Sequence, residues 1–190
     1  MANEILKYLS KYVNITEDIE KAINESVYIK NFTKGTILLK EGDFSNDCYF
    51  ILKGCIRSFY LKDGDEKTSE FYTENQVVLP NEYGQRIPSE CFIECVEDTI
   101  VCIGNKELET LAFQKYPQLE KIHHVIADMM VVNYQKTFTE FKMSSPEQRY
   151  LWLLKNRADL MQRAPQYQIA SYLGIKPETL SRIRKRIVKK

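Results

Sequence analysis

The sequence predicts an α+β protein in which an N-terminal antiparallel β-barrel is followed by one long helix and a small helical domain. Short β-rich runs separated by turn residues occupy residues 27–104, and helical spacing returns from residue 105 onward. The charge is also divided. Residues 145–190 hold eleven Lys and Arg against three Asp and Glu, a net of +8, whereas residues 1–144 carry a net of −7. A basic end on an acidic body indicates a polyanionic partner at that end.

The overall composition is that of an ordinary globular protein, with 44% hydrophobic residues and a formal charge of +1 over 190 residues. No run approaches the roughly 18 uncharged apolar residues of a membrane helix, and the N-terminus lacks the apolar core of a secretion signal. The cysteines are odd in number and form no CxxC motif: Cys48, Cys55, Cys91, Cys95 and Cys102. We therefore expect reduced thiols, a cytoplasmic location and no membrane partner.

Two short helices are expected first, at about 3–13 and 17–26, the second beginning after the N-cap residue Thr16. The Asp63-Gly64 pair between two alternating runs is a strong hairpin signal. Short strands at this spacing favour an antiparallel sandwich or barrel. The expected strands are 27–32, 36–40, 48–53, 55–62, 68–73, 91–96 and 99–104.

A long helix is expected over residues 119–142, which contain no Gly or Pro, after a short helix capped by Asn105 and a fresh start at Pro117. At ~1.5 Å per residue it would reach about 35 Å, too long for one small barrel to cover its apolar stripe easily. We expect self-association along this helix, the alternative being simple packing on its own barrel. The expected dimer interface follows three- and four-residue spacing: Ile122, Val125, Ile126, Met129, Met130 and Asn133.

A boundary is expected at residues 143–145, because Ser145, Pro146 and Gln148 form the pattern of a capping box with proline at the first helical position. The helix that begins here is predicted to run to about Gln162. Its buried face is predicted to comprise Leu151, Leu154, Ala158 and either Met161 or Leu160.

Residues 166–187 have the pattern of a helix-turn-helix, with a tight turn at Gly174 and a second helix opening at Pro177. At 100° per residue, Leu180, Ile183 and Ile187 share the core side of the second helix. On the other side, Arg182 can donate two hydrogen bonds to guanine and Glu178 can accept one from cytosine. The expected DNA contacts are Glu178, Thr179, Ser181, Arg182 and Lys185, flanked toward the phosphates by Lys176, Arg184, Arg186, Lys189 and Lys190. The alternative is a charged solvent face on a packed bundle.

The segment from Ile169 to Ile183, with Glu-Thr-Leu-Ser-Arg at 178–182, resembles the helix-turn-helix of the cyclic-AMP receptor/fumarate-nitrate regulator (Crp/Fnr) family. The glycine turns at 34–35, 41–43 and 53–54 look like those of the family's cyclic-nucleotide-binding jelly roll. The resemblance covers nearly the whole chain. It implies a sensor domain at 1–116, a dimerisation helix at 117–143 and a DNA-binding domain at 144–190, which departs from the family in lacking a full β-wing.

The ligand pocket departs from the family more strongly. Members that bind cyclic AMP use a Phe-Gly-Glu turn and an Arg-Ser/Thr-Ala run, whereas residues 76–91 contain no Gly-Glu and place Ser89 at the Arg position and Glu90 beside it. A carboxylate within about 4 Å of a phosphate costs a few kcal/mol in a partly buried site, so we expect no cyclic-AMP binding. The alternative is that Arg86 reaches in from the neighbouring loop and restores a positive charge. The candidates for contacting another effector are Glu82, Tyr83, Gln85, Arg86, Ser89 and Glu90, unless this is simply a polar loop.

No cofactor, metal or enzymatic activity is expected. The cysteines do not form the N-terminal cluster of iron–sulfur members, and His123 and His124 are expected at a surface or interface rather than as haem ligands. The resemblance implies a homodimeric transcription regulator that binds an inverted-repeat site in double-stranded DNA, controlled by an effector other than cyclic AMP or by none, with RNA polymerase as a further partner. The alternative is a small-molecule sensor or protein-interaction module of the same fold without regulated DNA binding.

Overall fold

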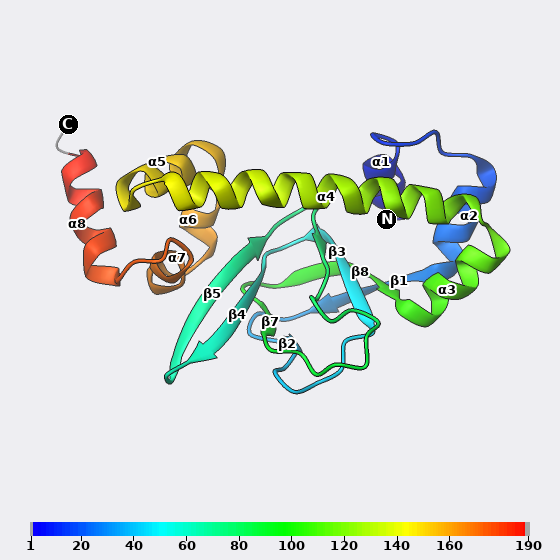
Figure 1. The fold of residues 1–190 in the computed structure, drawn as a ribbon, viewed down its shortest axis with the longest axis horizontal. Coiled ribbons are helices and arrows are strands. Elements are labelled where there is room, and N and C mark those ends of the chain that lie inside the picture. The colour runs from blue at the N-terminus through cyan, green and yellow to red at the C-terminus, as the bar shows by residue number, and fades with distance from the viewer. Residues whose placement is uncertain (1, 189–190) are drawn as a thin grey trace.

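The computed structural model describes residues 2–188, in which a β-sandwich is flanked by helices at both ends (Figure 1). The strands are β1 (Val27–Phe32), β2 (Ile37–Leu39), β3 (Asp47–Lys53), β4 (Ile56–Lys62), β5 (Asp65–Tyr72), β6 (Val77–Val78), β7 (Phe92–Cys95) and β8 (Thr99–Asn105). The helices are α1 (Ala2–Leu9), α2 (Glu17–Ser26), α3 (Lys106–Lys115), α4 (Gln118–Met143), α5 (Pro146–Asn156), α6 (Leu160–Arg163), α7 (Gln166–Tyr172) and α8 (Pro177–Val188).

The strands form two four-stranded antiparallel sheets, ordered β1-β8-β3-β6 and β2-β7-β4-β5. The predicted jelly roll is therefore confirmed, but as a sandwich of two sheets rather than a closed barrel. Every expected β-rich run contains a strand, and only the two-residue β6 was missed, because so short a strand leaves no alternating pattern. The core between the sheets is apolar and includes Tyr49, Ile51, Ile56, Ile93 and Val101.

The Asp63-Gly64 hairpin is present between β4 and β5, with Lys62 paired to Asp65. Asp63 and Gly64 both have positive φ, 55° and 82°, which is the backbone of the tight turn favoured between antiparallel strands. β5 is the last strand of its sheet, so one side of it is not paired with another strand.

The N-terminal helices pack against the start of α4. Ile5 of α1, Ile19 of α2 and Ile122 of α4 belong to one buried cluster with Phe50 of the sandwich. The N-cap at Thr16 is confirmed, since its side chain accepts from the Ile19 N–H, but α1 ends at Leu9, short of the predicted residue 13. From this end α4 extends across the sandwich to α5 (Figure 1).

The single helix predicted from 146 to 162 is wrong. Its capping box is present at Ser145 and Gln148, but the helix ends at Asn156 and a short α6 follows. The buried residues are Tyr150, Leu153 and Leu160. The expected Leu151 is 44% exposed and Ala158 is also exposed, because α5 and α6 turn their apolar sides toward β5.

Between Pro146 and Val188 the described residues form only helices, and their core is shared with the sandwich. Cys55, Phe71 and Val96 of the sandwich lie in one buried cluster with Leu153, Leu160, Ile169 and Leu180 of the helices. The predicted boundary at 143/144 coincides with the end of α4, yet separate folding of residues 144–190 stays a prediction, because this shared core crosses the boundary.

Candidate nucleic-acid interface

α7 and α8 are joined by a turn that only glycine adopts readily. Gly174 has a φ of +69°, and its N–H donates to the Ser171 carbonyl at 2.9 Å. The Ile175 N–H donates to the Ala170 carbonyl at 3.0 Å, which completes the end of α7. A Cβ at Gly174 would lie 3.3 Å from Nη1 of Arg149. The turn therefore sets the angle at which α8 leaves the domain.

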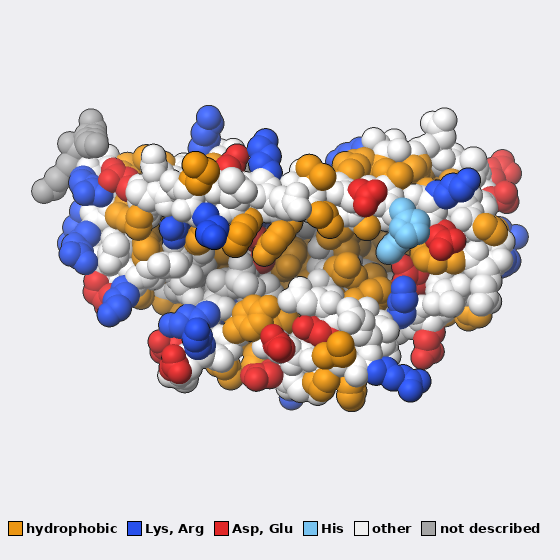
Figure 2. Space-filling model, in the orientation of Figure 1, with side chains coloured by type: hydrophobic (Ala, Val, Ile, Leu, Met, Phe, Trp, Pro, Cys, Tyr) orange, Lys and Arg blue, Asp and Glu red, His pale blue; other side chains and the backbone are white. Residues whose placement is uncertain are grey.

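α8 has one buried and one exposed side, as the spacing predicts. Leu180 and Ile183 are buried in the shared core, and Ile187 packs against it. Lys and Arg side chains predominate at the end of the molecule that carries α8 (Figure 2). The expected base-reading residues Glu178, Ser181, Arg182 and Lys185 and the flanking Lys176 are all exposed. These five residues are hereafter called the reading surface.

Other expected DNA contacts are placed differently. Thr179 is half-buried, and its hydroxyl accepts a long hydrogen bond of 3.4 Å from Nη2 of Arg182. Arg186 is exposed but forms an ion pair with Glu147 of α5, so its charge is already partly compensated. Arg184 is half-buried. Lys189 and Lys190 lie outside the described residues.

Two arginines that the sequence places in the basic end do not belong to the reading surface. Arg157 and Arg163 turn toward carboxylates on the sandwich, namely Glu70, Glu74 and Glu97. Their role was missed because no linear motif marks it.

The six candidate effector residues are not gathered into one site. Gln85, Arg86 and Glu90 are exposed, whereas Ser89 is buried. The Ser89 hydroxyl donates to the Cys91 carbonyl at 3.1 Å and accepts from the Cys91 N–H at 3.3 Å. The side chain at the family's Arg position is therefore an internally bonded hydroxyl with no positive charge, which does not fit a cyclic phosphate.

Glu82 and Tyr83 lie deeper in the same loop. Oε2 of Glu82 is buried without a hydrogen-bond partner among the described residues. Burial raises the pKa of Tyr83, and its hydroxyl donates to Oε2 of Glu109 on α3 at 3.3 Å. Oε1 of Glu109 in turn lies 3.2 Å from Nε2 of His123 on α4. Side chains therefore connect the candidate effector loop with the long helix through Glu109.

The expected dimer residues divide between two environments. Ile122 is 9% exposed and Ile126 packs beside it against the N-terminal helices of the same chain. Val125 and Asn133 are exposed, while Met129 and Met130 are half-buried. From residue 131 to 143 every α4 residue is exposed, and four of the apolar ones follow three- and four-residue spacing: Val131, Tyr134, Phe138 and Phe141. This set is hereafter called the α4 seam.

The cysteines are free thiols, four of them buried. Burial raises the pKa of Cys55 to about 12 and those of Cys95 and Cys102 to about 11, so these thiols stay protonated. Cys91 and Cys95 pack in the sandwich core. Across residues 2–188, no helix is both long enough and apolar enough to span a bilayer.

The comparisons with known proteins match this architecture. Residues 29–114 match the family model of the cyclic nucleotide-binding domain. A 76-residue segment is 29% identical to the HTH-type transcriptional regulator ArcR of Staphylococcus aureus; it covers 40% of this chain and 32% of that relative, so the match spans about a third of the relative's length.

Two solved structures share the fold over most of the chain. FixK2 from Bradyrhizobium japonicum has a TM-score of 0.68 at 20% identity and covers 86% of this chain and 85% of its own. The c-di-GMP responsive global regulator CLP of Xanthomonas campestris has a TM-score of 0.68 at 14% identity, with 100% and 92% coverage. Residues 29–114 thus match the cyclic nucleotide-binding domain, and the chain has the fold of the Crp/Fnr transcription regulators, as its helix-turn-helix and glycine turns predict.

Proposed function

We propose that this protein is a homodimeric transcription regulator that binds a specific sequence in double-stranded DNA, and that it is not an enzyme. The observation that carries the proposal is the reading surface of α8. Its charged side chains are exposed while the opposite side of the helix is buried, and a helix so presented can enter a major groove. Arg182 would donate to guanine and Glu178 would accept from cytosine, while Lys176 would contact phosphate.

The α4 seam supports a dimer. Large apolar side chains such as Tyr134 and Phe138 are exposed there on successive turns, an arrangement that two helices bury by pairing. Val125, Met129, Met130 and Asn133 would extend this interface toward the N-terminus of α4, while Ile122 and Ile126 would support it from within their own chain. Paired α8 helices about 34 Å apart would read an inverted repeat. The regulator fold suggests RNA polymerase as a further partner.

An effector other than cyclic AMP, or none, fits the candidate effector loop best. Ser89 supplies no charge for a phosphate, and Arg86 of the same loop is exposed. Any ligand that moved Tyr83 would act on α4 through Glu109 and His123. We propose no resident cofactor. Isothermal titration with cyclic AMP tests this part, because binding at micromolar concentration would contradict it.

Selection of bound sequences from a random duplex library tests the central proposal. Wild-type protein is expected to enrich a symmetric motif, and Arg182→Ala to lose preference at one base pair of each half-site. Lys40→Ala, an exposed lysine of the sandwich, is the control and should enrich the wild-type motif. Failure of the wild-type protein to enrich any sequence would contradict DNA reading and favour a sensor or protein-interaction module.

A further inference from the structure

The helical domain is docked on the sandwich by its side opposite to the reading surface. Phe71 of β5 is fully buried against the helices, and its ring meets that of Tyr172 on α7 in an edge-to-face contact at 5.4 Å. Leu153 of α5 and Ile169 of α7 belong to the same buried cluster. Apolar burial of this kind holds the two parts together, but it does not by itself fix their orientation.

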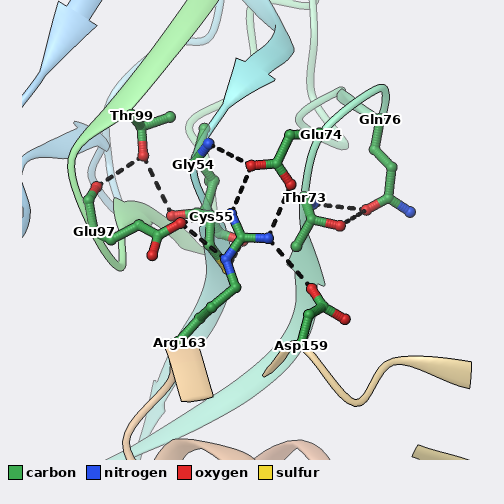
Figure 3. Close-up of polar contacts among 10 residues, drawn as sticks. Gly54, Cys55, Thr73, Glu74, Gln76, Glu97, Thr99, Asp159 and Arg163 are labelled. Carbon is green, nitrogen blue, oxygen red and sulfur yellow. Dashed lines mark hydrogen bonds and ion pairs between the residues drawn. The ribbon is translucent and has the colours of Figure 1, made fainter. Parts of the chain in front are cut away.

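Arg163 of α6 supplies directional contacts at this interface (Figure 3). Its two terminal nitrogens each donate to one oxygen of Glu74 at 2.8 Å, and its Nε donates to Oε1 of Glu97 at 2.9 Å. Glu74 is itself held in place, since its Oε1 also accepts the Gly54 N–H at 2.8 Å. A guanidinium bonded in this forked way has one allowed orientation, unlike a lysine ammonium.

Two further contacts lie along β5. Arg157 donates from Nη1 to the Phe71 carbonyl at 2.8 Å and lies 3.1 Å from Glu70. The hydroxyl of Ser171 on α7 accepts the Thr68 N–H at 2.9 Å and donates to the Glu66 carbonyl at 3.2 Å. α7 therefore satisfies backbone groups on the free side of an edge strand, which would otherwise be open to another chain.

Resting on the proposed DNA-reading function, we propose that Arg163 is a positioning residue that clamps the helix-turn-helix onto the sandwich and so fixes where α8 stands in the dimer. The chain linkage at Ser144 and Ser145 would allow the helical domain to rotate, whereas the clamp joins it to two turns of the sandwich, at Glu97 and Glu74, which are 66 and 89 residues away in the chain. When the helical domain of each subunit is held in this way, the distance between the two reading surfaces of the dimer is fixed.

The ionic state of the clamp supports this role. Burial alone would raise the pKa of Glu74, but hydrogen bonds from Arg163 and from the Gly54 N–H outweigh it and lower that pKa to about 2. The pair is therefore charged at neutral pH.

Hydrogen exchange on the full-length protein tests the clamp directly. Arg163→Met is expected to speed exchange about tenfold at the Thr68 amide and along α7, while the amides of β3 and β8 keep their protection. Arg163→Lys should give exchange rates between those of the wild type and Arg163→Met, because lysine keeps the positive charge but cannot form the forked pair of hydrogen bonds. Lys155→Met, at an exposed lysine of the same helical domain, is the matched control.

Unchanged exchange at Thr68 and α7, or an equal loss of protection throughout the sandwich, would overturn the proposal. Should Arg163→Met fail to fold, Glu97→Gln removes a single partner and is expected to change the same amides less.

DNA binding to sites with different half-site spacing separates a positioning role from direct DNA contact. On the selected symmetric site, inserting one base pair between the half-sites should weaken wild-type binding far more than it weakens Arg163→Met, so that the spacing preference falls about tenfold in the variant. Arg182→Ala should bind every spacing more weakly and keep the wild-type ratio. A wild-type ratio in Arg163→Met would overturn the proposal. If the wild-type protein reads no DNA at all, the proposed function fails, and hydrogen exchange alone then decides whether the clamp exists.

Discussion

The basic residues of the C-terminal end fall into two groups that differ in what they face. Arg182 and Lys185 of α8 and Lys176 just before it are exposed, whereas Arg157 and Arg163, earlier in the helical domain, contact carboxylates of the sandwich. Residues of both groups contribute equally to the net charge of residues 145–190, so the net charge does not distinguish them. A basic segment can therefore face a polyanionic partner with some of its residues and the acidic body of its own chain with others, and only the position of each residue in the fold separates the two uses.

The largest expected effect concerns the core shared by the sandwich and the C-terminal helices. Phe71→Ala should lower the free energy of unfolding by about 3–5 kcal/mol, because it removes a fully buried ring from between the sandwich and the helices. Calorimetry or denaturant unfolding should show a single, shifted transition for the whole chain. Two separate transitions in the wild-type protein would show that the helical domain has a core of its own.

Next in size is the difference between base recognition and phosphate attraction within the reading surface. Arg182→Ala should lose about 1–3 kcal/mol of discrimination between the selected site and random duplex. Lys176→Ala should weaken both duplexes alike and reduce the salt dependence of binding. Fluorescence anisotropy at several salt concentrations measures both quantities. Equal losses on the two duplexes for Arg182→Ala would remove it from base reading.

Acid should weaken the clamp through Glu74. The pKa of Glu74 is lowered to about 2 in the folded protein from an ordinary value of 4.5, so its contribution is complete above about pH 4.5 and is lost as the pH falls toward 2. The Glu74 side chain is 37% exposed, and solvent screening should keep the effect below about 1 kcal/mol. Stability measured against pH should be flatter in Glu74→Gln across this range, and identical curves would contradict the assignment.

The smallest effect is expected at Leu151, which the sequence places on the buried side of α5 and the structure places in solvent. Leu151→Ala should change the free energy of unfolding by no more than about 0.5 kcal/mol. Leu153→Ala, its matched partner in the shared core, should cost about 2–5 kcal/mol. Comparable losses for the two variants would show that Leu151 is covered in solution, for example by a second copy of the chain.

The features that the sequence predicts well are local. Thr16, Ser145 and Gly174 act through hydrogen bonds and backbone angles within a few residues, and the two sides of α8 follow from helical spacing alone. The predictions that failed depend on distant partners. The helix expected to reach residue 162 ends at Asn156, where Arg157 bonds to the Phe71 carbonyl of β5, 86 residues earlier in the chain.

The long helix shows the same division. Residues 119–142 predict its length and its apolar spacing. They do not predict which of its apolar residues are buried against the rest of the same chain. Ile122 and Ile126 pack against α1 and α2, so the apolar residues that remain exposed in a row lie nearer the C-terminal end of the helix, at the α4 seam. By itself, then, the sequence determined the turns, the helix caps, the strand runs and the reading surface, since each arises from neighbours in the chain. Tertiary structure alone decided where Arg157, Arg163 and the apolar stripe of α4 find their partners, because packing chooses among surfaces far apart in sequence.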